Sequence, residues 1–188
     1  MNKRTLLAAF AVTVFAAACS TTAPQVGADP AAKRSEIDAK VDGALTKLYA
    51  QARGSQELVQ RAKGVLVFPT VVSAGFVVGG SHGNGALRVH GRTEGYYSTT
   101  AATVGLVAGA DSRAVYILFM TDEALDKFRA SKGWTAGADA SVSVLNAGAD
   151  VGVDTQTAKQ AVIGYVLTNA GLMANVAIDG TKISKIDI

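Results

Sequence analysis

Residues 79–83 read Gly-Gly-Ser-His-Gly, a G-x-S-x-G spacing that could present a nucleophilic serine. In one class of hydrolases this serine stands on a sharp turn between a strand and a helix. Ser81 would also need a histidine within reach and an acid to orient that histidine. The chain contains only His82 and His90. Because neighbouring side chains of an extended chain point apart, His82 is unsuited to serve Ser81, and catalysis would depend on His90 and on a helix after Gly83.

The residues after Ser81 favour a turn instead of a helix. Asn84-Gly85 is the preferred dipeptide of a type I′ hairpin turn. Residues 86–98 then alternate apolar and polar side chains, as a returning strand does. The sequence therefore predicts that residues 79–85 form a glycine-rich hairpin turn, with His90 on the return strand. A serine hydrolase that acts on a lipid or ester through Ser81 is kept as a remote alternative.

No other group of residues has the spacing of a catalytic or metal centre. Two histidines without the HExxH spacing and a single cysteine do not make a zinc site. The glycine-rich stretch lacks the Gly-Lys-Ser/Thr ending of a phosphate loop. Asp139, Asp150 and Asp154 do not have calcium-loop spacing, and we interpret them as strand and turn residues that face solvent. We expect no catalytic residue, no metal, no cofactor and no enzymatic activity.

The beginning of the chain is typical of an exported protein. Lys3 and Arg4 precede an apolar stretch, residues 6–18, which is shorter than the roughly 20 residues of a membrane span. Small residues then run into Cys19, the only cysteine, which resembles a bacterial lipobox. The sequence predicts a lipoprotein signal peptide over residues 1–18 and lipidation of Cys19. An ordinary signal peptide followed by an unrelated cysteine is the alternative.

Residues 19–32 are rich in Thr, Ala and Pro, have no apolar period, and predict a flexible tether. The lipobox resemblance implies sorting by the next residue, Ser20. A residue other than Asp there usually directs a Gram-negative lipoprotein to the outer membrane, where the domain would face the periplasm or the cell surface. Removal of residues 1–18 takes away Lys3 and Arg4, so eighteen basic residues become sixteen, against fifteen acidic ones. This near balance, without a basic run, argues against nucleic acid as a partner.

Residues 33–188 predict a single α+β domain. We expect N-terminal helices that pack on a mostly antiparallel, Gly/Ala-rich β-sheet or barrel-like core with one inserted helix. Apolar residues at steps of three and four indicate a helix over residues 33–53, followed by Ser55 as the N-cap of a second helix over residues 56–63. Residues 65–69 predict a short buried strand that is ended by its proline.

The rest of the chain predicts strands interrupted by one helix. Residues 114–120 form an uninterrupted apolar run, as in a central strand that is buried on both faces. Thr121 is the expected N-cap of a helix, with Asp122 and Glu123 in its positively polarised first turn. Asp179-Gly180 predicts a two-residue turn before a C-terminal strand.

Four ordered segments resemble the SYLF domain, a lipid-binding domain that is also called an actin-regulator domain in fungi. They are residues 62–87, 95–128, 137–151 and 163–183. The resemblance extends over about residues 34–188, nearly the whole chain after the predicted signal and tether. Bacterial members of this family are commonly lipoproteins, which agrees with the prediction for Cys19.

The resemblance implies that the domain binds phospholipid. Eukaryotic members bind phosphoinositides through an N-terminal amphipathic segment and basic residues. Lys63, within the matching Ala62-Lys63-Gly64, and its neighbour Arg61 are the lipid-binding residues that the resemblance implies. The preceding helices carry acids as well as bases, which weakens attraction to anionic lipid: Glu36, Asp38, Asp42 and Glu57. Actin is not an expected partner, because an exported bacterial protein does not meet it.

These observations leave two functions from different classes. The first is an acyl-anchored envelope lipoprotein whose domain binds a phospholipid membrane. The second is a structural or protein-interaction domain of the outer membrane, with a protein partner in the envelope and lipid contact only through the acyl anchor. An apolar face outside the core would support the second function.

Overall fold

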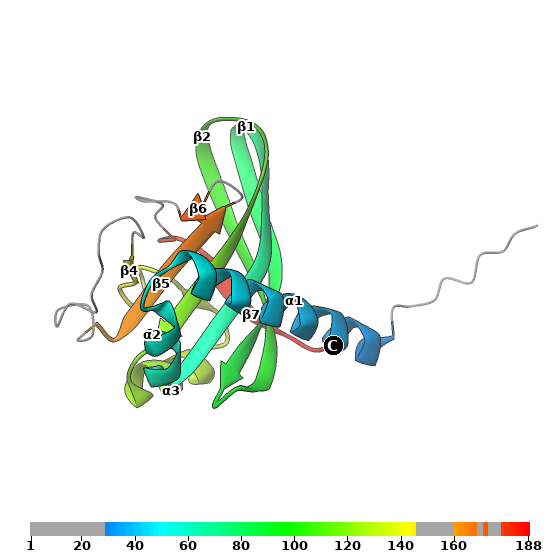
Figure 1. The fold of residues 1–188 in the computed structure, drawn as a ribbon. Coiled ribbons are helices and arrows are strands. Elements are labelled where there is room, and N and C mark those ends of the chain that lie inside the picture. The colour runs from blue at the N-terminus through cyan, green and yellow to red at the C-terminus, as the bar shows by residue number, and fades with distance from the viewer. Residues whose placement is uncertain (1–28, 146–159, 169–170, 173–177) are drawn as a thin grey trace, which may run out of the picture.

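The protein has an α+β fold in the computed structural model, which describes residues 29–145, 160–168, 171–172 and 178–188 (Figure 1). This confirms the predicted fold class. The described elements are three helices and a seven-stranded sheet: α1 (Pro30–Gln51), α2 (Ser55–Arg61), β1 (Gly64–Val89), β2 (Arg92–Phe119), α3 (Asp122–Ala130), β3 (Trp134–Thr135), β4 (Ser143–Val144), β5 (Val162–Thr168), β6 (Gly171–Leu172) and β7 (Lys182–Ile186). The predicted signal peptide, Cys19, Asp150 and Asp154 lie outside the described residues.

One long antiparallel hairpin, made of β1 and β2, is the frame of the sheet. The other strands attach to it in the order β3-β7-β2-β5-β4, with β6 added to β5. Strand β5 pairs with residues 113–119 of β2, whereas β7 pairs with residues 96–100. Only the β4–β5 pairing is parallel among the described strands, so the sheet is mostly antiparallel as expected.

The β1–β2 hairpin folds back on itself. At the bend a Cβ atom on Gly75 would lie 2.3 Å from the Cα of Gly79, closer than real side chains come. Past the bend, the second half of β1 lies against the first half. A Cβ atom on Gly85 would lie 2.0 Å from the carbonyl oxygen of Val67. Glycine is therefore needed at position 85 because two backbones meet there.

This packing corrects the prediction for residues 79–85, which are not a turn. They continue β1 without interruption, and each pairs with a residue of β2. The two-residue turn is His90-Gly91, where both φ angles are positive, at 50° and 77°. Positive φ at both central positions is the requirement of a type I′ turn. The Asn84-Gly85 dipeptide misled the prediction because its glycine serves close packing and not a turn.

The prediction that Pro69 ends a short strand is also wrong. Strand β1 continues through Pro69 to Val89, with a register shift between Phe68 and Val71. Proline is tolerated in a strand at such a bulge, where no ladder hydrogen bond is required from its nitrogen.

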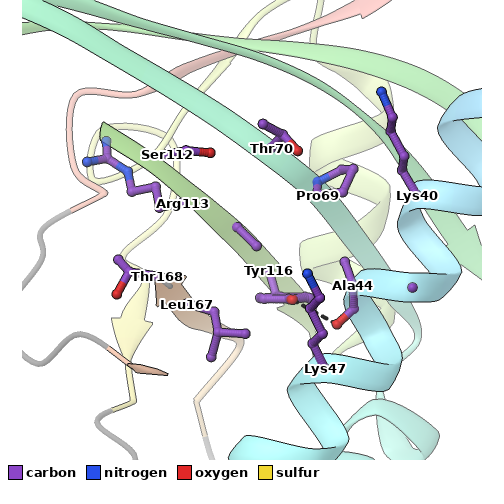
Figure 2. A pocket seen from close by; sticks show the side chains of 12 residues that line it. Lys40, Ala44, Lys47, Pro69, Thr70, Ser112, Arg113, Tyr116, Leu167 and Thr168 are labelled. Carbon is purple, nitrogen blue, oxygen red and sulfur yellow. Dashed lines mark hydrogen bonds between the residues drawn. The ribbon is translucent and has the colours of Figure 1, made fainter. Parts of the chain in front are cut away.

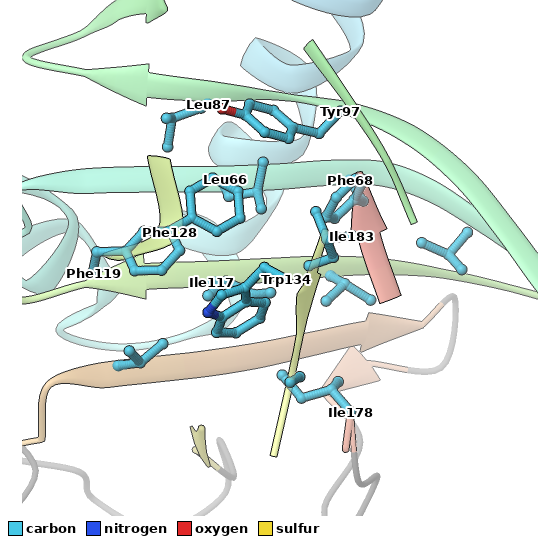
Figure 3. Packing of buried hydrophobic residues seen from close by; sticks show 14 of the residues in the cluster. Leu66, Phe68, Leu87, Tyr97, Ile117, Phe119, Phe128, Trp134, Ile178 and Ile183 are labelled. Carbon is cyan, nitrogen blue, oxygen red and sulfur yellow. The ribbon is translucent and has the colours of Figure 1, made fainter. Parts of the chain in front are cut away.

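Two hydrophobic clusters lie on opposite faces of the central strands. The first packs the inner faces of the folded hairpin against α3 (Figure 3), and its largest members are Phe68, Tyr97, Phe119, Phe128 and Trp134. The second lies under α1 and α2 and includes Val65, Val67, Tyr116, Leu118, Ile163 and Tyr165. Residues 115–119 alternate between the two clusters, so the predicted strand that is buried on both faces is confirmed.

Helix α1 covers the outer face of the sheet (Figure 1). Its buried stripe is Ile37, Val41, Ala44 and Leu48, at the expected helical spacing. The helix begins at Pro30, inside the stretch predicted as tether. Proline is well suited to the first helical position, and the Asp29 side chain accepts a hydrogen bond from the nitrogen of Ala31.

Two other predicted helix ends can be compared with the structure. Ser55 is not an N-cap: it is buried inside α2 and its hydroxyl donates to the oxygen of Leu48. Gly54, with φ of 75°, occupies the capping position. The cap of α3 is confirmed, because the Thr121 hydroxyl oxygen accepts from the nitrogen of Ala124 at 3.2 Å. Of the helices that the structure describes, none has the length and apolarity needed to cross a membrane.

Candidate functional site

A groove of about 330 Å³ lies between α1 and the sheet (Figure 2). Helix α1 forms one wall, and β1, β2 and β5 form the other wall and the floor. The lining side chains include three cations and three hydroxyls: Lys40, Lys47, Arg113, Thr70, Ser112 and Thr168. The groove can therefore hold a ligand that is both anionic and rich in hydrogen-bond acceptors.

Two of the three cations lack an acidic partner among the described residues. Lys40 is paired, since its Nζ lies 2.5 Å from Glu36. Neither the Lys47 nor the Arg113 side chain makes a hydrogen bond or ion pair with the described part of the chain. The Nε of Arg113 is buried without a hydrogen-bond partner. A partly buried guanidinium with an unused donor is suited to bind an anion.

Figure 2 shows that these cations come from different sides of the groove. Lys40 and Lys47 extend from α1, and Arg113 extends from β2 at the far side, beside Thr168. The cations thus line the groove and do not converge on one atom. This arrangement fits an extended surface of phosphates better than one small ion held at a single point.

Tyr116 forms the floor of the groove and ties it to α1. Its hydroxyl donates to the backbone oxygen of Ala44 at 2.8 Å (Figure 2). Burial raises the pKa of Tyr116 to about 12, so the phenol is neutral at physiological pH. Burial has the same effect on the pKa of Tyr165, also about 12, in the cluster under α1. The floor therefore adds no negative charge that would repel an anion.

Lys63 and Arg61, the residues implied by the resemblance, do not line this groove. Lys63 lies at the α2–β1 junction, exposed, with its Nζ 3.2 Å from an oxygen of Asp122 at the start of α3. Arg61 lies on α2, exposed, with a nitrogen 3.7 Å from an oxygen of Glu57. Both side chains are exposed, but each lies beside an acidic side chain. Their role in lipid binding stays a prediction.

Two of the acids expected to weaken a cationic surface are bound to the sheet. Asp38 accepts hydrogen bonds from Thr93 at 2.7 Å and from Tyr96 at 2.9 Å. A nitrogen of Arg88 lies 2.7 Å from an oxygen of Asp42 and 3.5 Å from one of Asp38. These contacts fasten α1 to the hairpin. The sequence did not show them because the partners are about fifty residues apart.

Ser81 does not occupy the turn that a nucleophile requires. Strand, and not helix, follows Gly83, and Ser81 is buried at mid-strand with 6% exposure. His82 is exposed on the opposite face, and His90, predicted on the return strand, is a residue of the terminal turn. Among the described residues there is also no group of three His, Cys, Asp or Glu side chains that could hold a metal ion. The geometry therefore gives no support to Ser81 catalysis.

The described residues form an α+β domain with a cation-lined groove. A family model described as Ysc84, Las17-binding protein actin regulator, matches residues 100–187. Over these residues the match agrees with the resemblance to the SYLF-domain family. Its members are lipid-binding, actin-regulator-like domains and are not classed as enzymes. No curated protein matches the chain.

The matched range contains only part of the candidate site. Arg113, Ser112, Tyr116 and Thr168 lie inside it, whereas Lys47 lies outside. The match thus extends over the β2 and β5 residues of the groove, whereas its α1 and β1 residues lie outside the matched range.

Proposed function

We propose that this protein is an outer-membrane lipoprotein, anchored through Cys19, whose domain binds phospholipid headgroups in the groove between α1 and the sheet. The observation that carries this proposal is the pair Lys47 and Arg113. They are cations of one groove and have no acidic partner among the described residues. The match to a lipid-binding family supports phosphate as the anion that they receive.

The chemistry of the groove suits a phospholipid headgroup. Arg113 can donate two parallel hydrogen bonds to phosphate oxygens, and Lys47 adds a mobile positive charge. The hydroxyls of Thr70 and Ser112 add donors for the remaining oxygens. A basic side chain near an anionic membrane surface contributes about 1 kcal/mol to binding.

Lys63 and Arg61 remain a second candidate for the same function. They differ from Lys47 because each already faces an acid, at 3.2 Å and 3.7 Å respectively. Exposed pairs of this kind are weak and exchange partners readily. A membrane phosphate would therefore compete with Asp122 for Lys63, and only a direct comparison of variants separates the two sites.

Vesicle co-sedimentation tests the proposal with the chain that begins at Ser20. Both core clusters lie within residues 37–183, so this truncation removes no core residue. Vesicles of phosphatidylethanolamine with and without phosphatidylglycerol are compared at low and high salt. Lys47→Glu should weaken binding to the anionic vesicles about thirtyfold, because it reverses a charge and so costs about 2 kcal/mol. Lys132→Glu, an exposed change of equal charge beyond α3, is the matched control.

Three other results would change the assignment. A loss with Lys63→Glu that exceeds the loss with Lys47→Glu would move the site to the α2–β1 junction. Equal losses with Lys47→Glu and Lys132→Glu would show a response to net charge alone. Failure to bind any vesicle would leave the acyl group as the only lipid contact, and would favour the structural domain with a protein partner.

A further inference from the structure

The bend of the long hairpin forms a projecting tip, which we define as residues 72–80 of β1 and 101–110 of β2. Figure 1 shows this tip rising beyond the rest of the sheet. Pairing with β5 stops at Arg113, and pairing with β7 stops at Thr100. Between these positions β2 pairs only with β1, as far as the described strands show. Among the described strands, the tip is thus a two-stranded ribbon without a further neighbour.

The tip lacks the charges that normally keep an exposed ribbon in water. The sequence has no Asp, Glu, Lys or Arg between Lys63 and Arg88, and none between Glu94 and Asp111. Val72 and Val78 are the exposed large hydrophobic residues of the described chain, at 47% and 66% exposure. Exposed apolar residues gathered on a projection, instead of scattered singly, indicate a contact surface.

Charged residues occur again where the tip joins the rest of the sheet. Arg113 is paired with Val71, directly below the tip, and it lines the groove that also contains Lys47. Asp111, exposed and paired with Ser73, is the acid at the same level. From Val71 to the bend at Gly75 is four residues, about 13 Å of strand. An apolar end with the level of Arg113 about 13 Å behind it reproduces the order of acyl chain and phosphate in one leaflet of a bilayer.

We propose that the tip inserts into the interfacial layer of a phospholipid bilayer, with Val78 among the acyl chains, Val72 nearer the headgroups, and Arg113 and Lys47 at the phosphates. This inference rests on the proposed function and names the surface that the groove faces. A lipid surface fits better than a second protein chain, because the charge-free tip is backed by two cations without acidic partners among the described residues. The outer edges of the ribbon pair with no other described strand, which limits insertion to the interface, where water and headgroups satisfy backbone groups.

A fluorescent label tests the depth of the tip. The chain that begins at Ser20 contains no cysteine, so Val78→Cys creates a unique site for an environment-sensitive dye. His90→Cys, in the turn at the opposite end of the hairpin, is the matched control. With vesicles of phosphatidylethanolamine and phosphatidylglycerol, the dye at position 78 should shift to shorter wavelength, gain about twofold in emission and be quenched by spin-labelled lipid, as expected at interfacial depth. The dye at position 90 should not change.

A second variant separates insertion from folding. Val78→Asp should leave the urea midpoint of unfolding unchanged, because the side chain is mostly exposed in the free protein. It should weaken vesicle binding about tenfold, because a carboxylate is disfavoured at the acyl boundary. Unchanged vesicle binding by a folded Val78→Asp variant would overturn the inference.

The outcomes distinguish this inference from the function on which it rests. Co-sedimentation with a dye at position 78 that stays in water would refute tip insertion and leave headgroup binding in the groove intact. No co-sedimentation would refute the proposed function itself. A dye shift that appears without vesicles and grows with protein concentration would show that a second copy of the chain covers the tip, which would also overturn insertion.

Discussion

The two ends of the β1–β2 hairpin are built differently. At the turn end, around His90-Gly91, polar side chains tie the strands to α1: Arg88, Thr93 and Tyr96 bind Asp38 and Asp42. An ion pair between Glu94 and Arg129 adds a link to α3. At the bent tip the described residues make no such link, and exposed valines take the place of charges.

The difference indicates that the two ends of one continuous hairpin serve different purposes. Helices cover the turn end, so both faces of its strands contribute to the cores, and Arg88, Thr93 and Tyr96 each bind an acid of α1. At the tip, Val72 and Val78 belong to neither cluster, which leaves these two exposed side chains available for a contact outside the molecule. Stability should therefore reside in the body, and membrane contact in the tip.

The largest expected effect tests whether the hairpin truly folds onto itself. Gly85→Ala would place a Cβ atom 2.0 Å from the Val67 oxygen, where two backbones would have to separate. We expect a loss of about 4 kcal/mol or more in the free energy of unfolding, or failure to fold. Gly80→Ala is the control from the same glycine-rich stretch, because its Cβ atom would meet only an oxygen of Ala101 at 3.8 Å. It should cost less than about 1 kcal/mol.

Urea denaturation followed by circular dichroism measures both variants. Similar small losses for Gly85→Ala and Gly80→Ala would mean that residues 79–85 are an open turn, as the sequence alone predicted. The hairpin would then not bend at Gly75 and Gly79, and the contrast between its two ends would be wrong.

The glycine-rich stretch also shows which features of the fold could not be predicted from the sequence. The buried stripe of α1, the strand over residues 114–120 and the Thr121 cap were predictable, because each depends on residues within a few positions of one another. The role of Gly85 depends on Val67, eighteen positions earlier in the chain. Asn84-Gly85 has the residue types of a type I′ turn, but the packing of Gly85 against Val67 keeps this dipeptide in a strand.

The candidate site was missed for the same reason. Lys47 and Arg113 are far apart in sequence, and only the packing of α1 across β2 brings them to one groove. The family resemblance identified the lipid-binding class and named Lys63, but it did not contain the geometry that leaves Lys47 unpaired.

The second prediction concerns the stability of the cluster beneath α1 at high pH. Tyr116 and Tyr165 lie in the cluster beneath α1, and burial raises both pKa values to about 12, above the usual value near 10. Above pH 10 the unfolded chain releases phenolic protons that the folded chain retains, so stability falls as pH rises. The loss should approach about 1.4 kcal/mol per pH unit for each tyrosine between pH 10 and 12.

Urea unfolding at a series of pH values measures this loss. Tyr165→Phe should flatten the pH dependence without removing a hydrogen bond that the structure describes. Tyr116→Phe should flatten it as well, but at the cost of about 1 kcal/mol at neutral pH for the lost bond to Ala44. An unchanged slope in both variants would show that other groups control alkaline unfolding and that these tyrosines do not anchor α1.

The smallest effect concerns the polar link at the turn end. Asp38→Ala removes the acceptor of Thr93 and Tyr96 and leaves the mostly buried Arg88 with a single acid, so we expect a loss of about 2 kcal/mol. Asp42→Ala, at a more exposed carboxylate, should cost less than about 1 kcal/mol. Thermal unfolding measures both changes, and vesicle binding by the folded variants should stay the same. If Asp38→Ala instead reduced binding as strongly as it reduced stability, the two ends of the hairpin would not act independently, because the position of α1 would control the groove and the tip together.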